Sequence, residues 1–268
     1  MAILAMQSAA SGLRALNTRL DVTANNLANV NTEGFKASRV NFEDLMYIER
    51  AQPGVENANG DQRPTGLYIG LGVRESGTQQ DFSYGAPIPG NGVLDMFIDG
   101  RGFFQVQVEN DLGQGGIAYT RAGNFVLNAD NEVVLANSEG RRLEPGISIS
   151  PNAEDIQVDA NGQVWEILPG QPARVAGQVE LAIFVNPTGL TQAGSNLWVE
   201  SAASGPPITG TPGSENFGSI IGGMLEGSNV DPAVELIELI RTQRAFEMNS
   251  QSIQAADETL RSIAQLRR

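Results

Sequence analysis

The N-terminal stretch MQSAASGLRALNTRLDVTANNLANV, residues 6–30, decides how the ends of this chain fold. Large apolar residues recur in it every seven positions, at Met6, Leu13, Leu20 and Leu27. A second set stands three places later in each repeat, at Ala2, Ala9, Leu16, Thr23 and Val30. This is the spacing of a helix that pairs with another helix. The sequence therefore predicts a long N-terminal helix with a thin coiled-coil seam.

The C-terminal stretch has the same repeat. Its apolar positions are Leu239, Phe246, Ile253 and Leu260, and three places later stand Thr242, Asn249, Ala256 and Ile263. Asp231 can cap this helix, and Pro232 suits its first turn. Ordinary amphipathic helices packed on a globular core would show the same periodicity, and that alternative stays open. We favour pairing of the two helices with each other over packing on a globular core. Both apolar seams are thin, and the long segment between them has a different composition.

The middle of the chain has a different composition from its ends. All 13 prolines lie between Pro53 and Pro232, and residues 228–268 contain no glycine. Residues 41–229 carry 8 basic and 23 acidic side chains, whereas the two ends are almost neutral. Short apolar stretches alternate there with turn residues, which predicts the strands of a sandwich or open barrel. The predicted strands are 102–108 and 179–185, and the predicted hairpins are 124–135 and 156–165.

These patterns predict an α+β fold in three parts. The terminal helices, 1–40 and 230–268, would pair as a coiled coil and form the assembly core. An all-β middle of short antiparallel strands, 86–203, would form an outer domain. The polar, turn-rich segments 41–85 and 204–229 would be extended linking arms.

Composition excludes many kinds of chemistry. The chain of 268 residues has no Cys and no His, which removes Cys–His and Ser–His–Asp nucleophiles, His or Cys zinc sites, haem ligation and disulfides. It has no Gly-Lys pair for a phosphate-binding loop and no dinucleotide fingerprint. With 31 acidic residues, neighbouring carboxylates are expected by chance. We therefore predict no catalytic residue, no metal site and no cofactor.

Charge and apolar runs limit the partners. The net charge of −14 disfavours nucleic acid and anionic lipid. No apolar run approaches the roughly 18 residues that span a bilayer. No basic residue precedes Arg14, so we do not expect a cleaved secretory signal.

Several motifs together resemble one protein family. Residues 24–36, ANNLANVNTEGFK, are similar to the N-terminal signature of the bacterial flagellar rod and hook family, and residues 243–250, QRAFEMNS, to its C-terminal signature. Shorter matches lie at 100–104, 119–123 and 188–197. The resemblance covers the whole chain. Within the family, the chain length and the motif Phe42-Glu43-Asp44-Leu45, followed by a short extension, are most like the distal rod.

The resemblance implies a structural function without enzyme activity. The expected subunit forms the flagellar basal-body distal rod, a self-assembled helical tube that transmits motor torque from the proximal rod to the hook. Implied partners are the chain itself, proximal rod proteins, the hook protein, the P and L ring proteins and the flagellar type III export apparatus. Nucleic acid and small-molecule substrates are not expected. The implied location is the rod that crosses the periplasm, reached without signal cleavage.

The same resemblance, with the heptads, supplies the expected site residues. The assembly interface would comprise Met6, Leu13, Leu16, Leu20, Asn25, Asn26, Leu27, Asn29, Thr32, Gly34, Phe35, Leu239, Gln243, Arg244, Phe246, Asn249, Ser250, Ile253 and Leu260. Its amides would bond to backbone or to neighbouring subunits. A rod-stiffening extension would occupy residues 48–65. Its expected residues are Pro53, Gly54 and Pro64, together with Tyr47, which directly precedes the extension.

Other classes of protein remain open from sequence. A proximal rod or hook protein of the same family is the nearest. A secreted adhesin with coiled-coil ends is a second class, but it would be expected to carry a signal or an anchor. A carbohydrate-binding or hydrolysing β protein is a third, but it would need clustered exposed aromatic residues, and the chain has only Trp165 and Trp198 as tryptophans.

Overall fold

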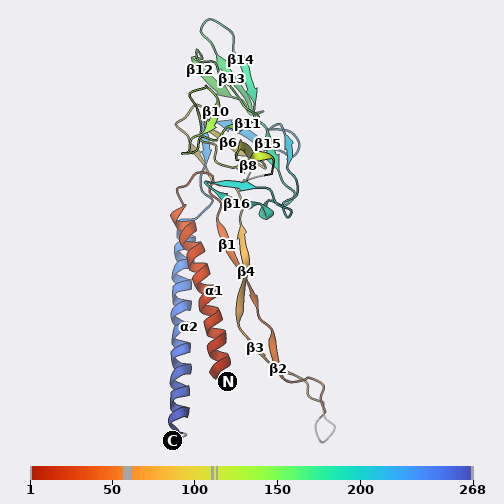
Figure 1. The fold of residues 1–268 in the computed structure, drawn as a ribbon, viewed down its shortest axis with the longest axis vertical. Coiled ribbons are helices and arrows are strands. Elements are labelled where there is room, and N and C mark those ends of the chain that lie inside the picture. Colours follow the sequence, from red (N-terminus) through yellow and green to blue (C-terminus); the bar gives the residue numbers. More distant parts are fainter. Residues whose placement is uncertain (1, 57–61, 110–111, 113, 267–268) are drawn as a thin grey trace. The chain divides into compact units, whose positions relative to one another are not determined.

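Along the chain, one long helix precedes and another follows a middle made of short strands. The computed structural model describes residues 2–56, 62–109, 112 and 114–266, and in it α1 spans Ala2–Ala28 and α2 spans Pro232–Leu266 (Figure 1). This confirms the α+β class and the predicted all-β middle of antiparallel strands. Within the described ranges, neither helix contains a segment long and apolar enough to cross a membrane.

Helix α2 begins where the sequence predicts. The Asp231 carboxylate accepts hydrogen bonds from the backbone N–H groups of Ala233 at 2.8 Å and Val234 at 3.3 Å. These are two of the first donors of the helix, which have no partner within it. Pro232 is the first helical residue, where its missing N–H costs nothing. The predicted cap is therefore confirmed.

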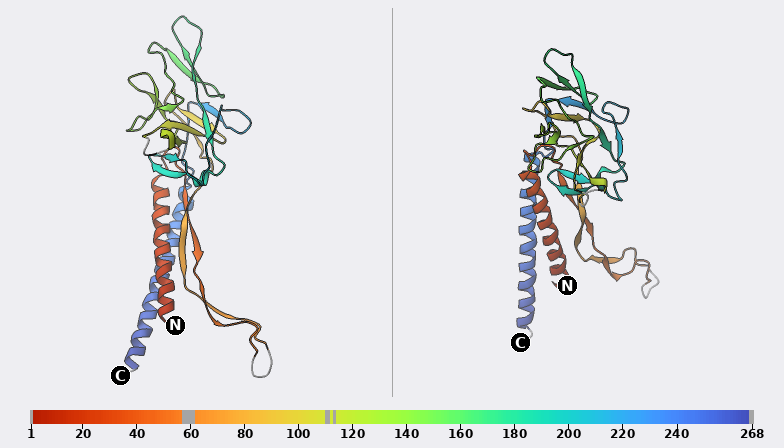
Figure 2. Two further views of the ribbon diagram at one scale, coloured as in Figure 1. Left: turned by 45° about the vertical axis from the view of Figure 1, so that its right-hand side comes forward. Right: turned by 45° about the horizontal axis from the view of Figure 1, so that its top comes forward.

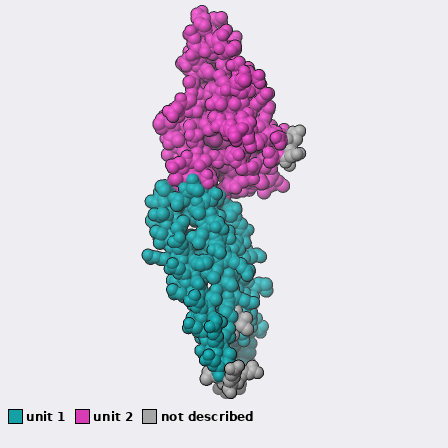
Figure 3. Space-filling view, turned by 60° about the vertical axis from the view of Figure 1, so that its left-hand side comes forward, with its two compact units in different colours: residues 1–28, 38–79, 231–268 teal, residues 29–37, 80–230 magenta. Residues whose placement is uncertain are grey.

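The chain divides into two compact units (Figure 3). Unit 1 comprises residues 1–28, 38–79 and 231–268, and unit 2 comprises residues 29–37 and 80–230. This division differs from the expected one in three respects. Residues 41–79 of the first arm belong with the helices, whereas the short segment 29–37 after α1 and the second arm, residues 204–229, belong with the β unit.

In unit 1, a two-part ribbon accompanies the helices. Strand β1 (Ser38–Asp44) pairs with β4 (Val73–Gln80), and β2 (Tyr47–Ala51) pairs antiparallel with β3 (Leu67–Gly70). The Ser11 hydroxyl of α1 accepts a hydrogen bond from the Val73 N–H at 3.2 Å. The ribbon thus lies beside α1, as Figures 1 and 2 show. Residues 57–61, part of the expected extension, lie outside the described residues.

In unit 2, the largest sheet has seven strands in the order β16-β17-β8-β7-β15-β18, with β11 paired to β7. Its strands are β7 (Phe103–Gln107), β8 (Ile117–Thr120), β11 (Leu143–Glu144), β15 (Leu181–Ile183), β16 (Thr191–Gly194), β17 (Leu197–Val199) and β18 (Ile208–Gly210). Two short 3₁₀ helices, η1 (Gln114–Gly116) and η2 (Pro187–Gly189), join them.

Smaller sheets complete unit 2. Strand β9 (Phe125–Leu127) pairs with β10 (Val133–Leu135), and β12 (Asp155–Val158) with β13 (Gln163–Ile167) and then β14 (Arg174–Gln178). Both hairpins predicted from sequence are thereby confirmed. Their turns contain Asn131 and Gly162, which have the positive φ angles of 60° and 77° that such turns need.

The segment 204–229 is not the linking arm that its Pro and Gly content suggested. Strand β18 pairs with β15, β19 (Ser219–Gly222) with β6 (Met96–Asp99), and β20 (Met224–Glu226) with β5 (Pro87–Pro89). The turn residues of this segment separate strands that are only three or four residues long. The pairing partners are distant in sequence, so local composition could not show them.

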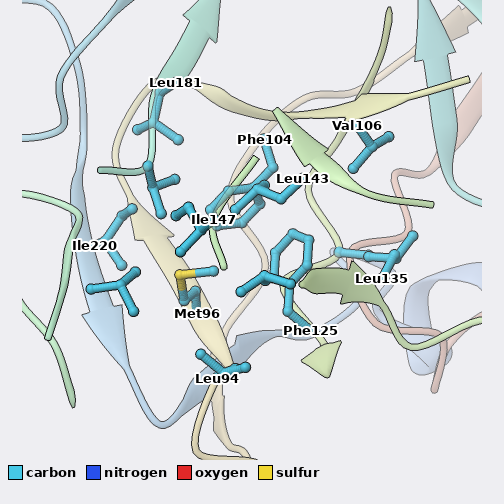
Figure 4. Close-up of a cluster of buried hydrophobic side chains, with 14 of the residues drawn as sticks. Leu94, Met96, Phe104, Val106, Phe125, Leu135, Leu143, Ile147, Leu181 and Ile220 are labelled. Atoms are coloured by element: carbon cyan, nitrogen blue, oxygen red, sulfur yellow. The ribbon is translucent and has the colours of Figure 1, made fainter. Parts of the chain in front are cut away.

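The core of unit 2 lies between these sheets (Figure 4). Fully buried side chains such as Met96, Phe104 and Leu181 form its centre, together with Phe125, Leu143, Ile147 and Ile220. A smaller aromatic cluster contains Phe103, Phe184 and Trp198. Trp198 is 3% exposed, whereas Trp165 is only partly buried.

Candidate assembly site

The helices of unit 1 contact one another through small and polar side chains. Arg19 of α1 pairs with Glu238 of α2 at 2.6 Å, and the Asn26 amide donates to Glu235 at 3.1 Å. A β-carbon added at Gly12 would lie 3.1 Å from the side-chain nitrogen of Asn249. As the residue numbers increase along α1, those of their contacts on α2 decrease, so the helices are antiparallel.

These contacts lie one position away from the predicted leucine seam. Arg19 and Asn26 directly precede Leu20 and Leu27, and the heptad leucines of α1 are partly buried rather than enclosed. The buried α1 positions are instead Ala15, Thr23 and Asn26. On α2 the partly buried predicted residues are Leu239, Phe246, Asn249, Ser250, Ile253 and Leu260. The remaining predicted α1 residues, Met6, Leu13 and Leu16, are also partly buried.

The other side of α2 is apolar and exposed. Leu236, Ile237 and Ile240 are 42–50% exposed, and Met248 is 61% exposed. We call these four residues the outer stripe of α2. The predicted residues Gln243 and Arg244 are exposed on this same side of the helix. Exposed apolar side chains in a row on a helix are typical of a surface that another protein covers.

Asn26 acts within the chain. It is 2% exposed, its amide nitrogen donates to the Ser38 carbonyl at 2.8 Å, and its oxygen accepts from the Ser38 N–H at 2.9 Å. This amide therefore bonds to the backbone of its own chain. The neighbouring Asn25 is exposed, and Asn29 accepts a hydrogen bond from the Thr32 hydroxyl at 3.1 Å.

Glu235 gives this contact a titrating group. Burial raises the pKa of the Glu235 carboxyl, nearby Glu238 raises it further, and the hydrogen bond from Asn26 lowers it. The folded chain therefore binds this proton more tightly than the unfolded chain does. Glu235 therefore favours the folded state most when its carboxyl is protonated. This contribution to stability is lost as the pH rises through the folded pKa of Glu235.

The signature residues after α1 lie in unit 2. Gly34 has a φ of +68°, its N–H donates to the Glu226 carbonyl at 2.8 Å, and an added β-carbon would lie 2.6 Å from the Ala122 nitrogen. A larger residue would suffer both backbone strain and collision. Gly34 is therefore needed inside the single chain. Thr32 and Phe35 beside it are partly buried.

Lys36 is the centre of a buried ion cluster, formed by Lys36, Glu226 and Arg121. The Lys36 ammonium donates to the Glu226 carboxylate and to the Ser83 carbonyl, both at 2.6 Å. Arg121 approaches the other oxygen of Glu226 at 3.4 Å. The side chains of Lys36 and Glu226 are 0% and 1% exposed. Two cations thus share one carboxylate in the interior of unit 2.

Backbone groups complete the cluster. The Glu226 carboxylate also accepts from the Gly85 N–H at 2.9 Å. Arg121 donates to the carbonyls of Ile98 at 3.2 Å and Gly100 at 2.7 Å. Its guanidinium carbon lies 5.3 Å from the centre of the Tyr84 ring. These contacts offset part of the cost of burying charge.

Burial sets the direction of the pKa shifts in the cluster. It lowers the pKa of Lys36 and of Arg121, and the Glu226 carboxylate opposes both shifts. The cluster therefore depends on Glu226, because without it two buried cations would remain. Asn229 adds a second connection: it accepts from the Ala37 N–H at 2.7 Å and donates to the Asp81 carbonyl at 2.8 Å. Residues 226–229 thus join three distant segments of unit 2.

The extension of unit 1 exposes its predicted residues. Tyr47 is 56% exposed, and Pro53, Gly54 and Pro64 are exposed as well. The Gly54 N–H donates to the Arg63 carbonyl at 2.8 Å, so pairing between the two sides continues beyond β2 and β3. The extension is therefore an antiparallel ribbon and not a free loop over the residues described.

Three family models match the chain. "Flagella basal body rod protein" matches residues 6–36, "Flagellar hook protein FlgE/F/G D1 domain" residues 97–166, and "Flagellar basal body rod FlgEFG protein C-terminal" residues 221–266. The chain is 41% identical to the flagellar basal-body rod protein FlgG of Caulobacter vibrioides, over 98% of this chain and 99% of that protein. It is 38% identical to FlgG of Borreliella burgdorferi and 36% to FlgG of Bacillus subtilis, each over 98% of both chains.

The chain belongs to the flagellar basal-body rod protein family. The family is also represented by FlgF of Caulobacter vibrioides, which is 31% identical over 93% of this chain and 92% of that protein. Identity to FlgG of the same organism is higher, at 41%. In agreement with the resemblance seen in the sequence, the chain is a structural subunit of the distal rod of the flagellar basal body.

The N-terminal family signature contributes to both units of this subunit. The N-terminal model, residues 6–36, covers most of α1 and then ends at Lys36 of the buried ion cluster. Sequence reasoning identified Lys36 as part of a motif but missed its partners Glu226 and Arg121. One signal was present: Lys36 is the only lysine in the chain, and Arg121 lies in another matched stretch.

Proposed function

We propose that this distal rod subunit assembles with copies of itself into a helical tube through its terminal helices. The observation that carries the proposal is the outer stripe of α2, whose four apolar side chains are uncovered in the single chain. Water contact at such a stripe is unfavourable, and burial of the exposed half of each side chain would contribute roughly 1 kcal/mol. A neighbouring subunit that covers the stripe would supply this energy at every step of growth.

The proposed assembly core also includes the partly buried leucines of α1. Within one chain, α1 and α2 would pair as a coiled coil through Gly12, Arg19 and Asn26 and their partners. The heptad leucines lie beside this contact and keep part of their surface free. They are suited to contacts between copies, together with Gln243 and Arg244.

The extension is proposed to brace neighbouring subunits. Its described residues form a ribbon with exposed Tyr47, Leu67 and Tyr68, which have no core of their own to enter. A narrow ribbon of this kind is marginally stable by itself. Contact with a neighbour would order it further and make the tube resist bending.

Partners and location follow from this role. The tube would join proximal rod proteins at one end and the hook protein at the other, and would turn inside the P and L rings as it crosses the periplasm. The subunit would reach the tip through the flagellar type III export apparatus without signal cleavage. Torque would pass through contacts between helices, so the proposed function needs no catalysis, metal or cofactor.

The substitution Ile240→Asp tests the proposal. It places a charge in the outer stripe, where assembly would bury it at a cost of several kcal/mol. We expect the variant to stay monomeric under conditions in which the unchanged chain polymerises, as measured by sedimentation and electron microscopy. Helix content by circular dichroism should stay the same, because Ile240 is 42% exposed in the single chain.

Val126→Asp is the matched control. Val126 lies on β9 of unit 2 and is 45% exposed, so the change in charge, chemistry and exposure is comparable. The control should polymerise normally. Equal polymerisation of both variants would show that the outer stripe is not an assembly surface.

A further inference from the structure

Unit 2 contains a pocket with aromatic walls and arginine at its rim. The pocket has a volume of about 250 Å³ and lies where the chain enters β7 and leaves β15. Phe82, Phe103 and Phe184 form apolar walls, and Val185 and Arg101 contribute to the lining. Val185 is 81% exposed, so a large part of this apolar side chain is uncovered in the single chain.

The pocket is positively charged in an acidic environment. Residues 29–37 and 80–230 contain 6 basic and 18 acidic side chains, a net charge of −12. Arg121 in the pocket wall belongs to the buried ion cluster, in which two cations share one carboxylate. The described lining contains two arginines, Arg101 and Arg121, and no carboxylate, so it is opposite in sign to the unit as a whole.

Arg101 differs from the other basic residues of unit 2. The other five pair with carboxylates; these pairs are Lys36 and Arg121 with Glu226, Arg141 with Glu139, Arg142 with Glu132, and Arg174 with Glu166. Arg101 is exposed and forms no ion pair with any residue that the structure describes. It presents its donors beside an apolar pocket, a combination that fits an apolar group adjoining a carboxylate.

We propose that this pocket receives a second copy of the chain, through an apolar side chain inserted between the phenylalanines and an adjacent Asp or Glu that pairs with Arg101. This inference rests on the proposed self-assembly. A second copy is the fitting occupant because the chain carries 31 acidic residues against 17 basic ones, so its surface is complementary to a cationic pocket. Each copy would need such compensation, since copies with a net charge of −14 repel one another.

A photo-crosslink identifies the occupant directly. Val185 is replaced by p-benzoylphenylalanine in the full-length chain, and assembled rods are irradiated. We expect a covalent dimer of the chain, with a crosslinked peptide that contains an apolar residue next to Asp or Glu. Val175, which is 46% exposed on β14 and outside the pocket, is the control position. Absence of the dimer in assembled rods, or a crosslink to another protein, would overturn the proposal.

Charge reversal tests the role of Arg101. Arg101→Glu places a carboxylate against the incoming carboxylate, and we expect the critical concentration for polymerisation to rise about tenfold or more. Arg101→Lys should recover part of the loss. Arg142→Glu makes the same change at another exposed arginine of unit 2 and should have a smaller effect on polymerisation.

The two proposals fail in different ways. If the unchanged chain does not polymerise, self-assembly itself is contradicted. If the unchanged chain polymerises and the Arg101→Glu and Arg142→Glu variants differ from it equally, only the pocket proposal is overturned. The thermal unfolding of the Arg101→Glu monomer should match that of the unchanged chain, because Arg101 is exposed and pairs with no carboxylate among the described residues.

Discussion

At the scale of single residues, one carboxylate determines whether buried charge in unit 2 is tolerated. Glu226 contacts Lys36, Arg121 and the Gly85 N–H, and its carbonyl accepts from Gly34. A buried ion pair contributes little net stability when it is intact, but removal of one partner leaves an uncompensated charge. The rod signature around Gly34 and Lys36 is therefore explained within one subunit.

Removal of the Glu226 charge should destabilise unit 2. We expect Glu226→Gln to lower its free energy of unfolding by about 3–5 kcal/mol, since it leaves Lys36 and Arg121 as buried cations without the carboxylate that they share. Urea unfolding followed by the fluorescence of buried Trp198 measures this. Glu43→Gln, in the exposed pair with Arg74, is the control and should change little. A similar midpoint for both variants would contradict the importance of the cluster.

Glu166 predicts a dependence of stability on pH. Hydrogen bonds from the Ser150 N–H at 2.7 Å, and then from Arg174 and the Ser150 hydroxyl, lower the pKa of this carboxyl from its ordinary 4.5. Its stabilising contribution is present above pH 4.5 and is lost as the pH falls through the folded pKa.

We therefore expect Glu166→Gln to be less stable than the unchanged chain at pH 7, because the charged acceptor is lost. The difference in urea midpoint should shrink as the pH is lowered toward 3. A difference that stayed constant from pH 7 to pH 3 would show that folding does not lower the pKa of Glu166. Asp159→Asn, in the exposed turn between β12 and β13, should show no comparable trend.

At the scale of elements, the helices and the ribbon of unit 1 are supported differently. Helix α2 is capped by Asp231, and the two helices share polar contacts such as Arg19 with Glu238. The ribbon beyond β1 and β4 has two strands and many exposed side chains. Its order therefore depends more strongly on neighbours, which motivates a test of rod stiffness.

Deletion of Gln52–Arg63 should leave polymerisation intact and give a bendable rod. The deletion spares α1, α2 and β1–β4, so the assembly surfaces remain. It removes the part of the ribbon that we propose to brace a neighbour. Electron microscopy of purified basal bodies measures curvature, with rods of the unchanged chain as the reference. Straight, stiff rods from the deletion variant would mean that the segment has no bracing role.

At the scale of the whole molecule, the two units use the chain ends differently. Unit 1 takes both termini, whereas unit 2 is closed by strands β18–β20, which pair with β15, β6 and β5 from earlier in the chain. Because these pairings join residues far apart in sequence, unit 2 cannot complete its core until residue 226 has been made available.

Two truncations test this closure. A chain that ends at residue 230 lacks α2 but keeps β19, β20 and Glu226, so unit 2 should retain its cooperative thermal unfolding. A chain that ends at residue 218 loses the partners of β5 and β6 as well as the carboxylate of the ion cluster. We expect it to lose cooperative unfolding by calorimetry. Identical transitions in both truncations would contradict this account of the core.

The sequence by itself determined the features that depend on local spacing. The proline and glycine distribution located the two helices, Asp231 marked the start of α2, and hairpins at 124–135 and 156–165 followed from their turns. The rod family was also visible, because its signatures are short contiguous stretches. Each of these signals lies within a few residues of the structure that it predicts.

Only the tertiary structure decided which distant residues meet. Segment 204–229 looked like a linker but forms strands, because its partners β5, β6 and β15 lie far away in sequence. The contacts of Arg19 and Asn26 with α2 fall one place from the leucine repeat, since the ribbon beside α1 also occupies part of its surface. Lys36 was visible only as part of a family motif, and the structure places Glu226 beside it. The tertiary fold decides whether a charged side chain is buried and which residue it pairs with. A motif in one segment does not show its partner in another.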